Sequence, residues 1–259
     1  MLVTVMTTAP RAVPTIKKSL ESVSRAALPA PTIFAEPGCE LIGNMALFHE
    51  KQGVWQNWKN AASFGAYSEG ATYVLTMQDD IDIHPGIIDL IEKLIPFHPS
   101  VGAVSLYASS LYGVIPGIHK VRTSGFWGSL CMLFEVSVLR DIINNPLAGT
   151  WKGINPTPIP SEVIDDDQAI AKILRRLNKS LYVVVPSPVK HTGSVSSIKK
   201  PHATRKLYPE HYSNFNVPIL DQIPLADFQE ITTNEQTPSW LVGTSATLKG
   251  ESNGTLQAS

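Results

Sequence analysis

The sequence predicts an α/β fold with a mostly parallel central sheet. Short apolar runs rich in β-branched residues alternate with longer segments whose apolar residues recur at helical spacing, over roughly 190 residues. Strands joined by helices favour parallel pairing with right-handed crossovers. The chain has 259 residues, 43% of them hydrophobic and 17% charged. It is therefore long enough to bury a full core as one domain.

The elements follow in a regular order. Residues 2–6 are expected to form the first strand, and Pro14 begins a helix to about residue 27 because Ile16, Leu20 and Val23 share a face. Further strands are expected at 32–35, from Tyr73 onward, at 101–107, at 129–134 and at 181–185. Further helices are expected at 55–67, 85–97, 135–144 and 166–177.

Two segments interrupt this order. Residues 108–127 are rich in Gly, Ser and Tyr, and residues 146–162 contain four prolines, so both are expected to be functional loops near a site. Beyond Pro209 the pattern fades, and from Thr232 polar residues and glycine dominate. The expected organisation is a domain over residues 1–208, a C-terminal extension over 209–231 and a flexible, disordered tail over 232–259.

Charge and cysteine content exclude several classes of protein. The formal net charge of -1 gives no global electrostatic case for binding nucleic acid or membranes. Cys39 and Cys131 are far apart, which argues against a disulfide scaffold or a cysteine-ligated metal and suits a reducing compartment. Residues 1–11 are interpreted as a strand and not as a signal peptide, and no segment reaches the length of a membrane span. We expect a soluble cytoplasmic protein.

The strand that starts at Tyr73 ends in three carboxylates, Asp79, Asp80 and Asp82. Parallel strands deliver their last side chains into the crevice where α/β proteins bind ligands. Mg²⁺ and Mn²⁺ need only one or two carboxylates there, because substrate phosphates and water complete their coordination. If the strand continues, Asp80 and Asp82 point at one ion. The alternative is that Asp82 is a turn or capping residue and the other two are solvated loop charges.

Several short segments fall at strand ends or helix starts. They are TTAPR at 7–11, EPG at 36–38, QNWKNA at 56–61, QDDID at 78–82, DDDQ at 165–168 and KHTG at 190–193. In this order, over about residues 1–199, they resemble the GT-A glycosyltransferases. The resemblance implies a GT-A-like domain with a Rossmann-like nucleotide-binding half. It also implies a nucleoside diphosphate sugar donor, most simply a UDP-sugar, and Mn²⁺ or Mg²⁺ as cofactor.

Nucleotide contacts follow from the same resemblance. They are expected at Thr7, Thr8, Glu36, Asn57 and Asp79. Arg11 suits phosphate oxygens because it is a permanent cation, although a solvated charge beside a helix is an equal alternative. Trp127 would offer an apolar face to a sugar ring, or else is a buried aromatic residue.

The resemblance makes Asp80 the metal ligand that holds the diphosphate, with Asp82 as a second ligand or a supporting residue. His191 follows the last predicted strand and would complete the site, since a neutral imidazole binds Mn²⁺. Residues 194–200 would then close over phosphate, with an ordinary mobile loop as the alternative.

The acidic helix start at Asp165, Asp166 and Asp167 has two interpretations. Carboxylates stabilise helix N-termini by capping and through the dipole. In inverting members of the family, a carboxylate here takes the proton of the acceptor hydroxyl. We favour Asp166 or Asp167 as this catalytic base.

Other classes fit the sequence less well. His84 stands where DxD-type phosphatases have a threonine, and the glycine patterns of dinucleotide and P-loop enzymes do not occur. A non-catalytic sugar-nucleotide or glycan-binding module and a sugar nucleotidyltransferase stay open. The acceptor is open among a glycan, a protein, a small molecule and a modified base such as hydroxymethylated DNA. The basic stretch 190–206 suits a phosphate backbone, but a solvated loop is the better explanation of it.

Overall fold

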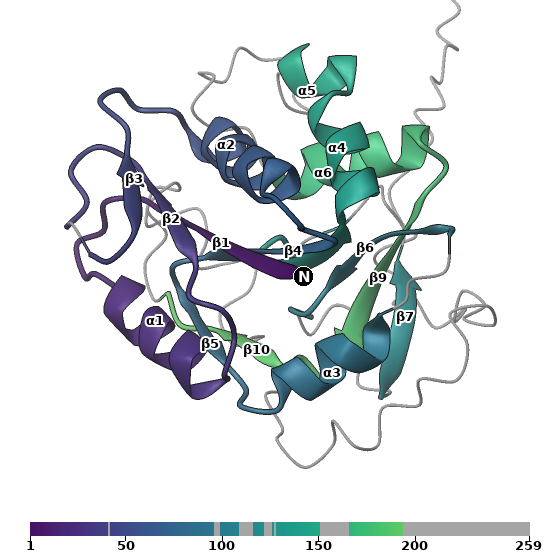
Figure 1. Ribbon diagram of the computed structural model, residues 1–259, viewed down its shortest axis with the longest axis horizontal. Coiled ribbons are helices and arrows are strands. Elements are labelled where there is room, and N and C mark those ends of the chain that lie inside the picture. The colour runs from purple at the N-terminus through teal and green to yellow at the C-terminus, as the bar shows by residue number, and fades with distance from the viewer. Residues whose placement is uncertain are drawn as a thin grey trace, which may run out of the picture.

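The computed structural model describes residues 1–40, 42–95, 99–108, 116–121, 126, 128–150 and 166–193 (Figure 1). The first elements are β1 (Leu2–Thr8), α1 (Ile16–Arg25), β2 (Thr32–Ala35), β3 (Met45–Leu47), α2 (Val54–Tyr67), β4 (Tyr73–Gln78), β5 (Ile81–Ile83) and α3 (Ile87–Leu94). They are followed by β6 (Val101–Ser105), β7 (Gly117–Val121), β8 (Cys131–Glu135), α4 (Val136–Ile143), α5 (Pro146–Thr150), α6 (Asp166–Arg176), β9 (Ser180–Val185) and β10 (Val189–His191).

In the described part of the chain, eight strands form one sheet in the order β3-β2-β1-β4-β8-β6-β9-β7. Strands β3, β2, β1 and β4 run parallel, as do β6 and β9. Strand β8 is antiparallel to both of its neighbours, and β7 is antiparallel to β9. The predicted α/β fold with a mostly parallel central sheet is confirmed, and β3-β2-β1-β4 form its Rossmann-like half.

Helices cover both faces of the sheet, and each face has its own apolar core. Helices α2, α4 and α6 pack on one face, while α1 and α3 pack on the other (Figure 1). Successive strand residues alternate between the two cores, as Val74 and Leu75 do. The strands therefore appear in the sequence as continuous apolar runs, which is typical of a sheet buried on both faces.

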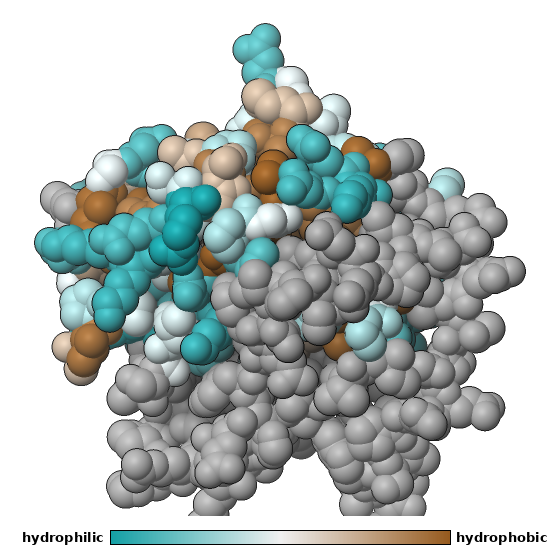
Figure 2. All heavy atoms as spheres, turned by 90° about the horizontal axis from the view of Figure 1, so that it is seen from below, coloured by the Kyte–Doolittle hydropathy of each residue, from teal (hydrophilic) through white to brown (hydrophobic). Residues whose placement is uncertain are grey.

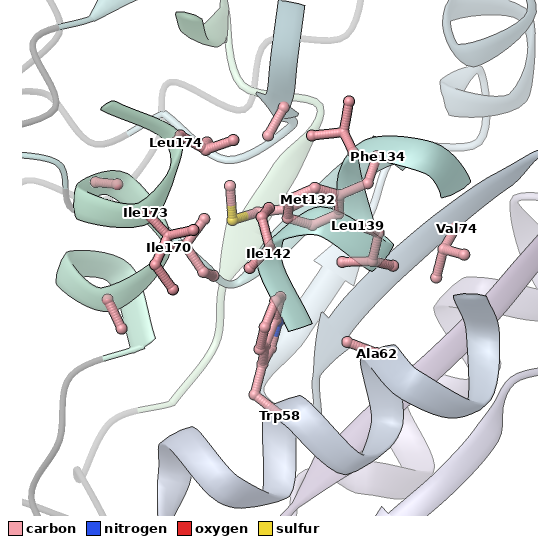
Figure 3. Packing of buried hydrophobic residues seen from close by; sticks show 14 of the residues in the cluster. Trp58, Ala62, Val74, Met132, Phe134, Leu139, Ile142, Ile170, Ile173 and Leu174 are labelled. Carbon is pink, nitrogen blue, oxygen red and sulfur yellow. The ribbon is translucent and has the colours of Figure 1, made fainter. Parts of the chain in front are cut away.

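Helix α2 lies close to the sheet because small residues face it. A Cβ at Gly65 would come 2.6 Å from Cγ1 of Val74, so β4 leaves room only for glycine. Trp58 stacks on Trp55 at 5.2 Å between ring centroids. It also meets Phe134 edge-on at 6.0 Å (Figure 3). Both tryptophans are buried core residues. This packing fixes where the N-terminus of α2 lies.

The structure corrects several predicted boundaries. Strand β7 lies inside the expected loop 108–127, and α5 opens the expected loop 146–162. Strands β3, β5 and β10 have three residues each, too few for an alternating pattern to identify. Helix α3 begins at Ile87 and not at Pro85, because the N–H of Gly86 is bonded to Nδ1 of His84 in a turn.

Some predictions fall outside the described residues, namely those for Trp127, Asp165, residues 194–200, the extension 209–231 and the tail 232–259. None of the described helices combines the length and apolar composition that crossing a bilayer requires. The face shown in Figure 2 mixes hydrophilic and hydrophobic side chains among its described residues, as folded domains generally do.

Candidate functional site

The parallel strands β1, β2 and β4 end side by side, with Thr8 beside Ala35 and Thr7 beside Gln78. A cavity of about 620 Å³ opens at this carboxyl edge. Its lining includes Thr7, Thr8, Arg11, Glu36, Asn57 and Gln78. Five of the seven residues predicted to bind the nucleotide therefore surround one pocket, as expected at the carboxyl edge of an α/β sheet.

The chain bends sharply between β4 and β5, at Asp79 and Asp80. The hydroxyl of Ser19, fully buried on α1, lies 2.7 Å from the carbonyl oxygen of Asp79 and 2.8 Å from that of Ile81, and it accepts the N–H of Ile81 at 3.1 Å. Ser19 was missed by the sequence reasoning. The sequence feature that could have identified Ser19 is its position as a small polar residue on the apolar face of a helix, between Ile16 and Val23.

Asp79 is 3% exposed and is held by the last residue of β1, Thr8, and by Arg11, which follows that strand. The hydroxyl of Thr8 donates to its Oδ2 at 2.6 Å, and Nε and Nη2 of Arg11 donate to its Oδ1 at 3.2 and 2.8 Å. Burial raises the pKa of Asp79 above its ordinary value, although Arg11 and Thr8 act in the opposite direction. Asp79, predicted to contact the nucleotide, is thus bound by two residues of the pocket lining, Thr8 and Arg11.

Asp80 is 4% exposed and contacts two other residues through one oxygen. Its Oδ2 lies 2.9 Å from Nη2 of Arg11 and 2.9 Å from Nε2 of His191, whereas its buried Oδ1 has no hydrogen-bond partner in the part of the chain that the structure describes. Burial opposes ionisation, but the interactions with His191 and Arg11 outweigh it and lower the pKa of Asp80. The carboxylate is ionised and has one oxygen to offer a ligand.

His191 reaches Asp80 because β10 pairs antiparallel with β5, placing His191 beside Ile81. The N–H of Thr192 donates to the carbonyl oxygen of Asp80 at 2.8 Å. A Cβ at Gly193 would lie 2.6 Å from Oδ2 of Asp80 and 2.9 Å from Nε2 of His191, so a larger residue at this position would displace both side chains. The structure brings together the predicted metal ligands Asp80 and His191.

Asp82 is not brought into this cluster. Strand β4 ends at Gln78, so no single strand presents Asp80 and Asp82 on a shared face, and that premise of the prediction is wrong. Asp82 instead pairs with Arg25 of α1 at 2.6 Å, and its side chain is 39% exposed. No group of three or more His, Cys, Asp or Glu side chains within the described ranges is arranged to hold a metal ion.

Glu36 and Asn57 each combine a structural contact with a place in the pocket lining. The two oxygens of Glu36 accept the N–H groups of Gln52 and Gly53 at 2.8 Å each, ahead of α2. The amide nitrogen of Asn57 lies 3.4 Å from the carbonyl oxygen of Thr8 and 3.2 Å from that of Phe34. These contacts fix the amide orientation and leave Oδ1 of Asn57 buried, with no partner among the residues described.

The two aspartates predicted as catalytic bases begin α6. Oδ1 of Asp167 accepts the N–H of Ser129 at 2.6 Å, and Oδ1 of Asp166 accepts the N–H of Asp167 at 3.0 Å. Gln78 links them to the pocket, because its Nε2 lies 3.3 Å from Oδ2 of Asp166 and 3.2 Å from Oγ of Ser129. Gln78 was not a predicted site residue, yet it joins the two halves of the site.

The residues present fit a divalent cation. Asp80 has a buried oxygen without a partner, and an imidazole nitrogen lies next to its other oxygen. A carboxylate and an imidazole are suitable ligands for Mn²⁺, and two protein ligands leave the other positions to water and phosphate oxygens.

No family model and no curated protein matches this sequence. Solved structures with a similar fold include residues 1–349 of TarS from S. aureus, at 13% identity and a TM-score of 0.46, covering 71% of this chain and 58% of that one. A second is the mannosyltransferase PcManGT from Pyrobaculum calidifontis in complex with GDP-Man and Mn²⁺, at 13% identity and a TM-score of 0.40, covering 71% and 56%.

A third is a putative glucose-1-phosphate thymidylyltransferase from Bacillus anthracis in complex with a sucrose, at 10% identity and a TM-score of 0.44, covering 74% of this chain and 89% of that one. The chain spans less than two thirds of the length of the first two structures. Likenesses this distant do not assign a function, which has to be argued from the residues of this chain.

Proposed function

We propose that this protein is a metal-dependent glycosyltransferase that moves a sugar from a nucleoside diphosphate sugar, a UDP-sugar in the simplest case, to an acceptor hydroxyl. One observation carries the proposal. Arg11 in the lining of the pocket at the ends of β1, β2 and β4 contacts an acid pair, Asp79 and Asp80, and among the described residues two buried acceptor atoms, Oδ1 of Asn57 and Oδ1 of Asp80, have no hydrogen-bond partner.

The pocket has the chemistry of a nucleoside site. Leaving a buried acceptor without a donor costs about 1–3 kcal/mol, so Oδ1 of Asn57 favours a ligand that carries an N–H or O–H group. The imide N–H of uracil and the ribose hydroxyls are such donors. Thr7, Thr8 and Glu36 line the same space, in keeping with their expected base and ribose contacts.

The acid pair has the chemistry of a diphosphate site. Asp80 and His191 would hold Mn²⁺ or Mg²⁺, and a bound ion supplies charge neutralisation for the diphosphate leaving group. Arg11 lines the pocket beside them, with a guanidinium suited to phosphate oxygens. Both kinds of contact favour a ligand with adjacent phosphates.

The acceptor would bind on the side of α6. A carboxylate within hydrogen-bond reach of the acceptor hydroxyl can take its proton, which supports single displacement with inversion at the anomeric carbon. Asp166 and Asp167 are the candidates for this base, and Gln78 connects Asp166 to the donor pocket. A glycan, a small molecule and hydroxymethylated DNA are the acceptors to test first.

Calorimetric titration of UDP with and without Mn²⁺, on wild type and Asp80→Asn, tests the donor site. We expect Asp80→Asn to lose the metal-dependent part of the UDP affinity while circular dichroism shows a folded protein. Equal UDP affinity of both proteins in Mn²⁺ would contradict the assignment.

Turnover needs a second assay. Hydrolysis of nucleotide sugars in Mn²⁺, followed by acceptor panels that include hydroxymethylated DNA, should identify a donor and then an acceptor. UDP binding without turnover would indicate a binding module, and formation of a nucleotide sugar from a nucleoside triphosphate and a sugar phosphate would indicate a nucleotidyltransferase.

A further inference from the structure

The guanidinium of Arg11 occupies the centre of the acid pair. Its Nη2 lies 2.8 Å from Oδ1 of Asp79 and 2.9 Å from Oδ2 of Asp80, so one nitrogen contacts both carboxylates. Its Nε makes a separate hydrogen bond to Asp79 at 3.2 Å. The Arg11 side chain is 11% exposed and also lines the pocket. It therefore faces the acids and the ligand space together.

This arrangement solves an electrostatic problem of the protein without ligand. Two adjacent carboxylates that are each less than 5% exposed repel one another, and a buried charge without a counter-charge is strongly destabilising. Arginine stays charged at all ordinary pH values, so Arg11 compensates the pair independently of the state of His191.

The same arrangement conflicts with a metal ion. A divalent cation held by Asp80 would compete for a carboxylate that Arg11 already contacts, and it would lie close to a like charge. The conflict is relieved if the guanidinium leaves Asp80. Because Nε bonds to Asp79, Arg11 can give up Asp80 and keep an anchor.

We propose that Arg11 is a resident counter-ion, which holds the acid pair while the pocket is empty and moves from Asp80 to the diphosphate when metal and nucleotide bind together. The inference rests on the proposed function and adds a coupling to it. The metal alone must displace Arg11 without offering it a new partner, whereas the nucleotide supplies one. Metal and nucleotide therefore strengthen each other's binding, and linkage makes this effect reciprocal.

Mn²⁺ binding, measured by the electron paramagnetic resonance of the free ion with and without UDP, tests the coupling. Wild type should bind Mn²⁺ weakly alone and more tightly with UDP. Arg11→Gln should bind Mn²⁺ alone more tightly than wild type, by roughly 5- to 150-fold, the usual range for coupled sites. UDP should strengthen Mn²⁺ binding by this variant much less than it strengthens Mn²⁺ binding by wild type. Arg25→Gln is the matched control, because Arg25 also pairs with an aspartate but is 52% exposed.

Thermal unfolding gives an independent readout that needs no nucleotide. Arg11→Gln should lower the Tm in metal-free buffer, and Mn²⁺ should raise the Tm of this variant by more than it raises that of wild type. Arg11→Lys keeps the charge and the fold but cannot make all of the guanidinium contacts, so its Mn²⁺ affinity should lie between the other two.

The proposal is overturned if neither Arg11 variant binds Mn²⁺ alone more tightly than wild type, or if UDP strengthens Mn²⁺ binding equally in all the proteins. Arg11 would then be a structural counter-ion that stays bound to Asp79 and Asp80 whether or not a ligand is present. The two proposals fail separately. A wild type that binds Mn²⁺ but not UDP contradicts the donor site, while the comparison in Mn²⁺ alone contains no nucleotide and still decides whether Arg11 competes with the metal.

Discussion

Strand β4 connects two buried regions that differ in how their polar atoms are satisfied. Around Trp58 and Phe134 (Figure 3) the chain completes its own contacts. The indole N–H of Trp58 donates to Oγ1 of Thr76, and that of Trp55 donates to the carbonyl oxygen of Ala148. At the carboxyl edge of the sheet, Asn57 and Asp80 are equally buried, but among the described residues Oδ1 of each side chain has no donor. Burial alone does not separate a core from a site, whereas polar satisfaction does.

The difference implies that substitutions at the pocket end should change function and substitutions at the core end should change stability. The largest effect is expected for the catalytic base. Asp166→Asn or Asp167→Asn should lower glycosyl transfer by roughly 10²–10⁴-fold in one of the two variants, because a general base contributes that much. Loss of a helix-capping contact costs only about 1 kcal/mol of stability in either.

This prediction is tested by measuring three properties of both variants, namely the transfer rate at saturating donor, the UDP affinity and the stability to urea. Donor binding should stay nearly intact in both variants, and nuclear magnetic resonance of the product should show an inverted anomeric centre. Retention of configuration, or full activity of both variants, would contradict this role. The two aspartates would then serve only to cap the helix and to bind the backbone N–H of Ser129.

At the core end, Trp58→Ala should lower the free energy of unfolding by about 3–5 kcal/mol, the usual cost of removing a large buried aromatic side chain. Trp58 is 2% exposed and packs against both Trp55 and Phe134. Urea unfolding followed by circular dichroism measures the loss. The fraction that remains folded should bind UDP as wild type does, and a selective loss of UDP affinity would remove the distinction between the two regions.

The same distinction explains what the sequence could predict. Long elements with a clear pattern were predicted within a few residues, namely the continuous apolar runs of β1 and β4 and the helical spacing of apolar residues in α2. The residues that meet at the ends of parallel strands followed from the same logic. The bend after Gln78 did not, because it depends on Ser19, a contact between distant segments that no local pattern contains.

Two further features of the site were beyond the sequence for the same reason. The link from Gln78 to Asp166 and the bridging position of Arg11 join segments far apart in the chain. Strand β8 carries the composition of any buried strand, and its antiparallel direction is set by the path of the chain on either side of it.

Gly193 tests how closely the pocket end is packed. Gly193→Ala should leave the fold intact but lower Mn²⁺ affinity by roughly 10- to 100-fold, as expected when the residues that orient metal ligands are disturbed. The added methyl would press on Oδ2 of Asp80 and Nε2 of His191. Gly149→Ala is the control, because a Cβ there meets no atom within 4 Å. Equal Mn²⁺ affinity of the two variants would mean that the site has room to adjust.

The smallest expected effect compares the two cysteines, which belong one to each region. Burial raises the pKa of both thiols, and Cys131 is fully buried in the core. Cys39 is partly exposed, with its Sγ 3.9 Å from Oγ1 of Thr8 at the pocket. Because the thiolate is the reactive form, iodoacetamide should alkylate Cys39 more slowly than a free cysteine, and the rate should rise with pH to a midpoint above that of an ordinary thiol.

Mass spectrometry of the labelled protein can follow each thiol separately. UDP with Mn²⁺ should slow the alkylation of Cys39 a few-fold, since a nucleotide against Thr8 restricts access to the thiol. Cys131 should stay unlabelled, with or without UDP, until urea unfolds the core. Labelling of Cys131 at the same rate as Cys39 in the native protein would show that the two regions open together. An alkylation rate of Cys39 that UDP leaves unchanged would place the nucleotide away from Thr8.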